Sequence, residues 1–164
     1  MKDMVDAERC APRDAHAQRG RCELPHVDHR IRVPRGARIA TPTGLRPACS
    51  LRPQDRVVCR NSGALRVESC ATAKEIGALC KISLSAYACQ PLARALVLPG
   101  DQHLVLRDWR ATALFNRSEA NVRVERLIDG DLIRQVPPNP APFVLLNFSA
   151  PVILYAEGLE LASC

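Results

Sequence analysis

The stretch "RVPRGARIATPTGLRPACSLRPQDRVV", residues 32–58, sets the pattern for most of the chain. It contains two short aliphatic runs, "ARIAT" (37–41) and "DRVV" (55–58), separated by turns that contain Gly44 and Pro53. Short aliphatic runs between Gly and Pro are typical of β-strands joined by tight turns. We therefore expect this stretch to fold as strands.

The same pattern continues toward the C-terminus, with one exception at "ATAKEIGAL" (71–79), which predicts a single helical turn. We predict an all-β domain of about ten short strands over residues 31–164, preceded by a loose polar leader over residues 1–30. The further expected strands are "ALRVESC" (64–70), "CKISLSAY" (80–87), "RALVL" (94–98), "HLVLRDW" (103–109), "VRVERLI" (122–128), "DLIRQV" (131–136), "FVLLNF" (143–148) and "VILYAEG" (152–158).

Two segments repeat one design nearly half the chain apart. "LRPQDRVV" begins at Leu51 and "LIDGDLIR" begins at Leu127, and in both a turn residue and an aspartate precede an aliphatic strand. This spacing is typical of two related half-domains. We expect the side chains of Asp55 and Asp131 to bond backbone N–H groups in these turns.

Glycine and tryptophan give two further expectations. Gly130 and Gly158 stand in turns and suit backbone with positive φ. Aromatic residues make up only 4% of the chain, so we expect the single tryptophan, Trp109, to lie in the core.

The composition, 47% hydrophobic and 24% charged over 164 residues, is that of one soluble globular domain. The net charge is +6, but the arginines are interleaved with acids and form no basic block. Few aromatic residues are present to stack on bases. We expect a monomer with a solvated basic surface that does not bind nucleic acid, and an unknown protein partner stays open.

Targeting signals are not visible in the sequence. The first twenty residues have no apolar central region, and the most apolar stretch, "APFVLLNFSAPVILYAEGLELA", is interrupted by Asn147, Pro151 and Glu157. We expect no membrane association and assign the cytoplasm by default, with export without a signal peptide as the alternative.

The eight cysteines are spread along the chain without a CxxC pair. We interpret them as small buried thiols, and their pairing stays open. They stand at positions 10, 22, 49, 59, 70, 80, 89 and 164.

Five motifs follow one another in a characteristic order and spacing: "GARIATPTG" (36–44), "LRPQDRVV" (51–58), "LPGDQHLVL" (98–106), "LIDGDLIRQVPP" (127–138) and "VILYAEGL" (152–159). Together they resemble the Hint domain, which hedgehog autoprocessing domains and inteins share. The similarity is greatest to the short stand-alone Hint domains of bacteria. The resemblance implies a flattened all-β horseshoe of two pseudo-symmetric halves.

The activity that this resemblance implies is autocatalytic peptide-bond rearrangement, ending in self-cleavage. A Cys or Ser at the start of the domain attacks the preceding carbonyl, and a TxxH-like motif, SPQH in this branch, assists the departing amide. Aligned on Gly36, Arg38 and Ile39, the nucleophile position falls on Arg32. A guanidinium stays protonated and cannot attack a carbonyl.

The second motif is partly kept. His103 matches the family histidine and Gln102 its neighbour, whereas Gly100 replaces the hydroxyl residue. Where the family has an FDxHE-like stretch, this chain reads "FSAPV" (148–152), with Ser149 and Pro151 in place of the acid and the histidine. His103 is thus the candidate catalytic remnant.

We therefore expect a degenerate Hint domain that is inactive or strongly impaired, and no cofactor. Splicing is not supported, because it needs a terminal Asn and the last one is Asn147. The alternative is a non-catalytic binding module, which would use either its basic surface or a metal.

The sequence offers two alternative sites. Cys22, His26 and His29 stand within eight residues, with Cys10 as a fourth ligand for zinc, but the spacing matches no known finger. Catalysis by Cys59 or Cys89 with His103 is another alternative, and no spacing favours it.

Overall fold

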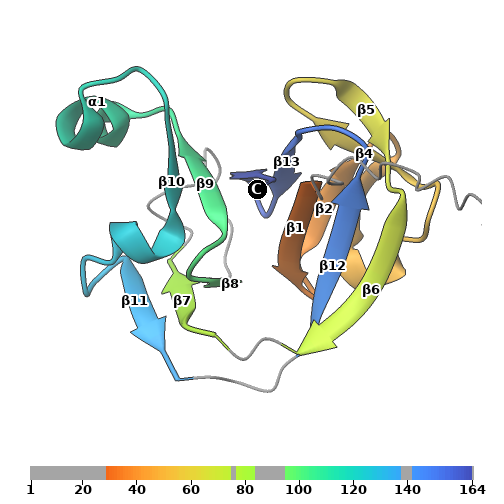
Figure 1. The fold of residues 1–164 in the computed structure, drawn as a ribbon, viewed down its shortest axis with the longest axis horizontal. Coiled ribbons are helices and arrows are strands. Elements are labelled where there is room, and N and C mark those ends of the chain that lie inside the picture. Colours follow the sequence, from red (N-terminus) through yellow and green to blue (C-terminus); the bar gives the residue numbers. More distant parts are fainter. Residues whose placement is uncertain (1–28, 75–76, 84–94, 138–141, 164) are drawn as a thin grey trace, which may run out of the picture.

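The computed structural model describes residues 29–74, 77–83, 95–137 and 142–163, which form fourteen strands, one α-helix and two 3-10 helices (Figure 1). The expected all-β class is confirmed. The strands are β1 (His29–Pro34), β2 (Arg38–Thr41), β3 (Gly44–Pro47), β4 (Arg56–Cys59), β5 (Gly63–Arg66), β6 (Ser69–Lys74), β7 (Leu79–Ile82), β8 (Leu96–Pro99), β9 (His103–Leu106), β10 (Ala120–Arg123), β11 (Ile133–Val136), β12 (Pro142–Phe148), β13 (Ile153–Ala156) and β14 (Leu159–Ala162). The helices are α1 (Trp109–Phe115) and the 3-10 helices η1 (Ala48–Ser50) and η3 (Val124–Leu127).

The strands pair antiparallel in three sheets. The largest has the order β10-β9-β14-β13-β2-β3, and β4, which pairs with β13, adds β5. The other two have the orders β1-β12-β6 and β11-β7-β8. In Figure 1, β1, β2, β4, β5, β6 and β12 lie in one lobe and β7, β9, β10, β11 and α1 in the other. This arrangement matches the expected horseshoe of two halves.

The two halves share their turn design. Leu51 follows η1, Leu127 ends η3, and both are buried. Asp55 Oδ2 accepts the N–H of the residue three positions before it, at 3.0 Å, as expected. In the second half Asp129, not Asp131, has the corresponding role: its Oδ1 accepts three N–H groups, at 2.9, 2.8 and 2.9 Å. The expectation for Asp131 was wrong because the turn folds back on the earlier aspartate.

Positive φ occurs at matching positions of the two turns. Gly130 has φ +81 and Gln54, which stands one residue before Asp55, has φ +76. Gly158 has φ +80, so both glycine expectations are confirmed. The repeat in the sequence therefore corresponds to a repeat in the backbone conformation.

The core is built almost entirely from aliphatic side chains that alternate along the strands. In β1, for example, Ile31 and Val33 are fully buried while Arg32 between them is half-buried. β1 begins at His29, so the last two residues of the expected leader pair with β12.

Four local expectations were wrong. Residues 71–74 continue β6, where they pair with β12, and do not form a helical turn. The strand expected over 103–109 ends at Leu106, and α1 follows because Asp108 caps it by accepting the N–H of Arg110 at 3.0 Å. Trp109 is 71% exposed and lies outside the core. The run 122–128 divides into the end of β10 and η3.

Candidate functional site

The structure brings Arg32 and Gln102 into contact although they lie 70 residues apart in sequence. Arg32 comes from the middle of β1, and Gln102 stands directly before β9. The backbone N–H of Arg32 donates to Gln102 Oε1 at 3.1 Å. Two positions that the sequence analysis matched separately to family motifs are therefore in direct contact.

Gln102 is 1% exposed, and its amide joins three strands. Its Nε2 donates to the carbonyl of Ala162 on β14 at 2.8 Å and to the carbonyl of His103 at 3.3 Å. These acceptors fix the orientation of the amide, because carbonyls require the NH₂ group. Oε1 is then left to face the N–H of Arg32.

The side chain of Arg32 is paired with Asp101. Nη2 lies 2.6 Å from Asp101 Oδ2, and the two side chains are 24% and 55% exposed. The pair is charge-assisted and fixes the position of the Arg32 guanidinium. The sequence prediction did not single out Asp101, although it is the acid within "PGDQH".

His103 begins β9, where it pairs with Arg123 of β10 and Ala162 of β14. Its side chain is half-buried and lines a polar hollow that also includes Arg123. His103 directly follows Gln102, the residue that contacts Arg32. Its catalytic role stays a prediction.

Gly100 lies in a crowded turn. A Cβ there would come within 3.3 Å of the carbonyl oxygen of Ala78 and of Glu125 Cβ. The backbone of Gly100 also bonds both neighbours, donating to Ala78 and accepting from the N–H of Glu125, each at 2.8 Å. A Ser or Thr at this position would require a shift of a few tenths of an ångström.

The peptide bond before Arg32 lies inside regular β-structure. Ile31 pairs with Leu146 and Arg32 with Leu145, both on β12. Ile31 is 0% exposed. This peptide bond is therefore part of the sheet formed by β1, β12 and β6.

Residues 148–152 lead into β13. The N–H of Val152 donates to Ser163 Oγ at 3.0 Å, and the N–H of Ser163 donates to the carbonyl of Val152 at 2.9 Å. This reciprocal pair fixes the end of β14, whose Ala162 carbonyl binds Gln102. Arg32, Asp101, Gln102 and the end of β14 thus form one connected polar cluster.

A family model for the Hint domain matches residues 33–164, beginning directly after Arg32. The chain belongs to the Hint domain family. A search of curated proteins gave no match. Among solved structures, the crystal structure of the gp41-1 intein is similar with a TM-score of 0.54 at 11% identity, over 80% of this chain and 98% of that one. A second structure, of the MchDnaB-1 intein, has a TM-score of 0.47 at 11% identity, over 80% and 99%. The likeness to the gp41-1 intein shows that this Hint domain has the intein-like fold.

The alternative cysteine site receives no support from Cys59. Its side chain is buried on β4, and burial raises the pKa of the thiol to about 11. A neutral thiol is a poor nucleophile. Cys89, the other candidate, lies outside the described residues.

The metal alternative falls mostly outside the described residues, which include neither Cys22 nor His26. His29 is described and lies at the start of β1, paired with Phe148. Within the described part of the chain, no group of three His, Cys, Asp or Glu side chains could hold a metal. No helix in that part is long and apolar enough to span a bilayer.

Proposed function

We propose that this Hint domain keeps the family fold but does not carry out self-cleavage. The observation that carries the proposal is the Arg32–Asp101 ion pair at the nucleophile position. A protonated guanidinium offers no lone pair to the carbonyl of Ile31. The first step of the family reaction, formation of a thioester or ester, then has no attacking atom.

The contact with Gln102 also favours the intact peptide bond. Self-cleavage needs a proton donor for the departing amide nitrogen of residue 32. Gln102 instead accepts the N–H of Arg32 through a carbonyl oxygen, while its NH₂ group is occupied by Ala162 and His103. A neutral carboxamide is too weak an acid to give a proton to a leaving amide nitrogen, so the contact stabilises the intact peptide bond.

The position of Ile31 gives a third argument. Cleavage after Ile31 would release the start of β1 from β12 and expose a side chain that is now fully buried. Burial of one such side chain stabilises the fold by about 1.5–3 kcal/mol. The segment before Arg32 therefore behaves as part of the domain and not as a leaving group.

A fusion with a reporter protein upstream of Met1 tests this proposal. Cleavage at the 31–32 bond would release the reporter, and dithiothreitol or hydroxylamine would accelerate the release by attacking a thioester or ester. We expect the fusion to stay intact with both reagents. Release of the reporter that His103→Ala abolishes would overturn the proposal.

A further inference from the structure

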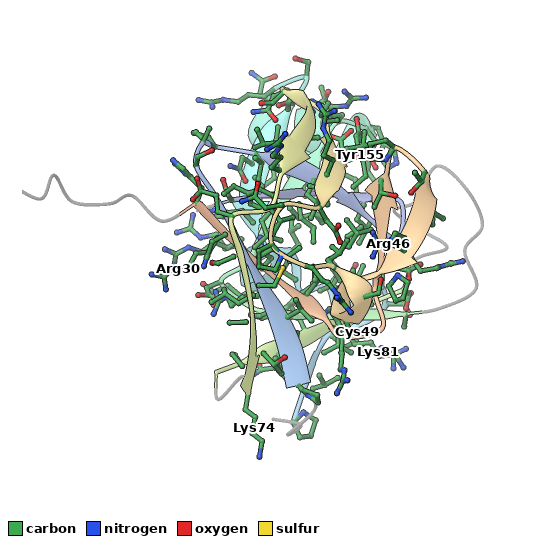
Figure 2. All side chains as sticks on the ribbon, turned by 90° about the vertical axis from the view of Figure 1, so that its right-hand side faces the viewer. Arg30, Arg46, Cys49, Lys74, Lys81 and Tyr155 are labelled. Atoms are coloured by element: carbon green, nitrogen blue, oxygen red, sulfur yellow. The ribbon has the colours of Figure 1, made fainter. Side chains whose placement is uncertain are left out.

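The structure gathers three arginines that are scattered in sequence around one hollow of about 520 Å³. Elsewhere the basic side chains are dispersed: in Figure 2, Arg30, Lys74 and Lys81 extend outward at separate places. The hollow lies along β10, which Figure 1 shows between α1 and the short helix that follows it. Its polar and aromatic lining consists of His103, Phe115, Arg117, Asn121, Arg123 and Arg126.

Local structure explains why these side chains converge. Asn116 ends α1 in the left-handed conformation, with φ 52 and ψ 41, and the chain turns so that the N–H of Arg117 bonds Ala111 at 3.2 Å. Alternation along β10 places Asn121 and Arg123 on its exposed face. Arg126 then comes from the last turn of η3.

The charge of the hollow is not balanced from within. No Asp or Glu is among the described residues that line it. Arg123 Nη1 lies 3.6 Å from Glu125 Oε1, an exposed pair, whereas Arg117 and Arg126 form no ion pair within the described residues. One arginine at a helix C-terminus is ordinary, since it offsets the helix dipole. Three guanidinium groups beside a histidine and an amide need a further reason.

We propose that this hollow binds a small phosphate-bearing molecule. Guanidinium groups present paired N–H donors that match the oxygens of a phosphate, and three of them favour a ligand with more than one negative charge. The volume lies within the range of small-molecule sites and exceeds what a single ion needs. The half-exposed ring of Phe115 supplies an apolar surface at the edge. A nucleoside diphosphate has this chemistry.

Titration calorimetry with inorganic pyrophosphate and with ADP, at low ionic strength in a phosphate-free buffer, tests the proposal. We expect both to bind, and the double variant Arg117→Ala/Arg126→Ala to weaken binding about tenfold or more, because charge-assisted hydrogen bonds are lost. The matched control is Arg52→Ala/Arg66→Ala. It removes the same charge from exposed arginines near the β4–β5 hairpin, which have no ion pair among the described residues.

Three results would overturn the proposal. They are no binding of either probe, an equal loss of affinity in the control variant, and tighter binding of a short single-stranded oligonucleotide than of ADP. The last would indicate an extended nucleic-acid surface, marked by a steep dependence on salt. Circular dichroism of both double variants excludes unfolding as the cause. The measurement involves no peptide cleavage, so its outcome is independent of the function proposed above.

Discussion

Arg32 and Gln102 show how residues that are distant in sequence can share one structural contact. Arg32 forms an ion pair with Asp101, and Gln102 uses all of its amide atoms to join β1, β9 and β14. A buried amide with satisfied hydrogen bonds contributes to a unique packing. The cluster of Arg32, Asp101 and Gln102 therefore holds together the place where these three strands meet.

Asp129 gives a prediction at the same scale. Backbone N–H groups donate hydrogen bonds to its carboxylate and lower its pKa. The largest contribution comes from the N–H of Ile133, and those of Asp131 and Leu132 contribute less. A pKa lowered on folding stabilises the native state above the unfolded-state pKa of about 3.9, and this contribution is lost as the pH falls through the folded value. We expect Asp129→Asn to lower Tm by about 3 °C at pH 7. The difference in Tm between the variant and the unchanged protein should disappear as the pH falls to about 2.

Thermal denaturation from about pH 2 to pH 7 measures this difference. Asp131→Asn is the matched control, because Asp131 lies in the same turn, and its described bonds come from its backbone. A pH-independent difference for Asp129→Asn, or an equal effect of Asp131→Asn, would contradict the assignment. The repeat in the sequence pointed to Asp131 because this residue matches Asp55. A sequence match shows which residues have equivalent positions, but it does not show which carboxylate accepts the N–H groups of the turn.

At the scale of elements, α1 is the clearest departure from expectation. Of its seven residues only Ala111 is buried, and Trp109 is covered on one side by the guanidinium of Arg110, 5.3 Å from the ring centroid. In the run "HLVLRDW", the apolar pattern typical of a strand ends at Leu106. The capping aspartate that follows was the available signal for the helix.

The exposure of Trp109 predicts a small effect of its removal. We expect Trp109→Ala to change Tm by about 2 °C or less, whereas Leu104→Ala, at a buried position of β9, lowers Tm by about 6 °C or more. Because the chain has one tryptophan, acrylamide quenching reports on it directly. Quenching of the native protein should approach that of the unfolded chain. Strong protection from acrylamide would show that the ring is buried.

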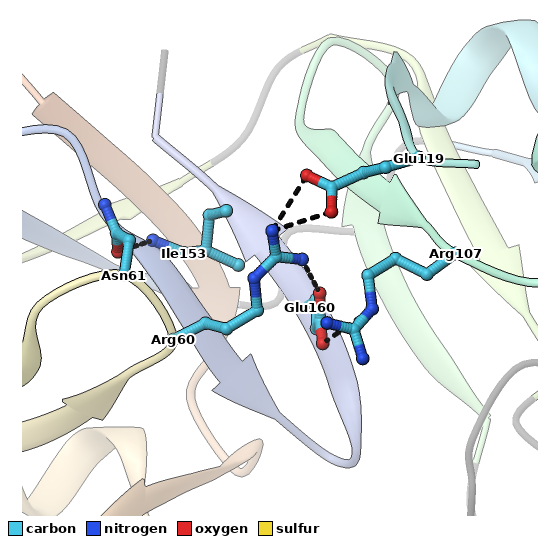
Figure 3. Close-up of polar contacts among 6 residues, drawn as sticks. All are labelled: Arg60, Asn61, Arg107, Glu119, Ile153 and Glu160. Atoms are coloured by element: carbon cyan, nitrogen blue, oxygen red, sulfur yellow. Dashed lines mark hydrogen bonds and ion pairs between the residues drawn. The ribbon is translucent and has the colours of Figure 1, made fainter. Parts of the chain in front are cut away.

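An ion-pair network joins the end of β4 to β14 and to the residue before β10 (Figure 3). Arg60, directly after β4, bonds Glu160 on β14 at 2.7 Å and both carboxylate oxygens of Glu119, before β10, at 2.8 and 2.7 Å. Arg107 lies 3.7 Å from Glu160. The two carboxylates raise the pKa of Arg60, and Arg60 lowers the pKa of Glu119.

We expect Arg60→Ala to lower Tm by about 4 °C, because Glu160, only 14% exposed, loses its nearest cation. The loss should be smaller at high salt, where exposed parts of the network are screened. Arg66→Ala, on β5 without an ion pair among the described residues, is the control and should leave Tm within about 1 °C. Equal shifts for the two variants would mean that the network adds no stability.

At the scale of the whole molecule, the repeat and the ordered motifs were sufficient to predict the class, the two halves and most strands. Four strands, β1, β3, β6 and β14, were missed. β6 was expected to be mostly a helical turn, and the others are short runs in turns or at the ends of longer patterns. Arg32 and Gln102 were singled out separately from the sequence, and the structure shows that they are in contact. The sequence could not show the Asp101 pair or the basic hollow, which depend on how side chains from several elements converge.

The central claim, a Hint fold without self-cleavage, is tested most directly by the intact mass of the purified full-length chain. The mass is measured at once and again after overnight incubation with dithiothreitol or hydroxylamine. The account predicts a single unchanged mass in every sample. A loss that matches cleavage between Ile31 and Arg32, absent in His103→Ala, would contradict it.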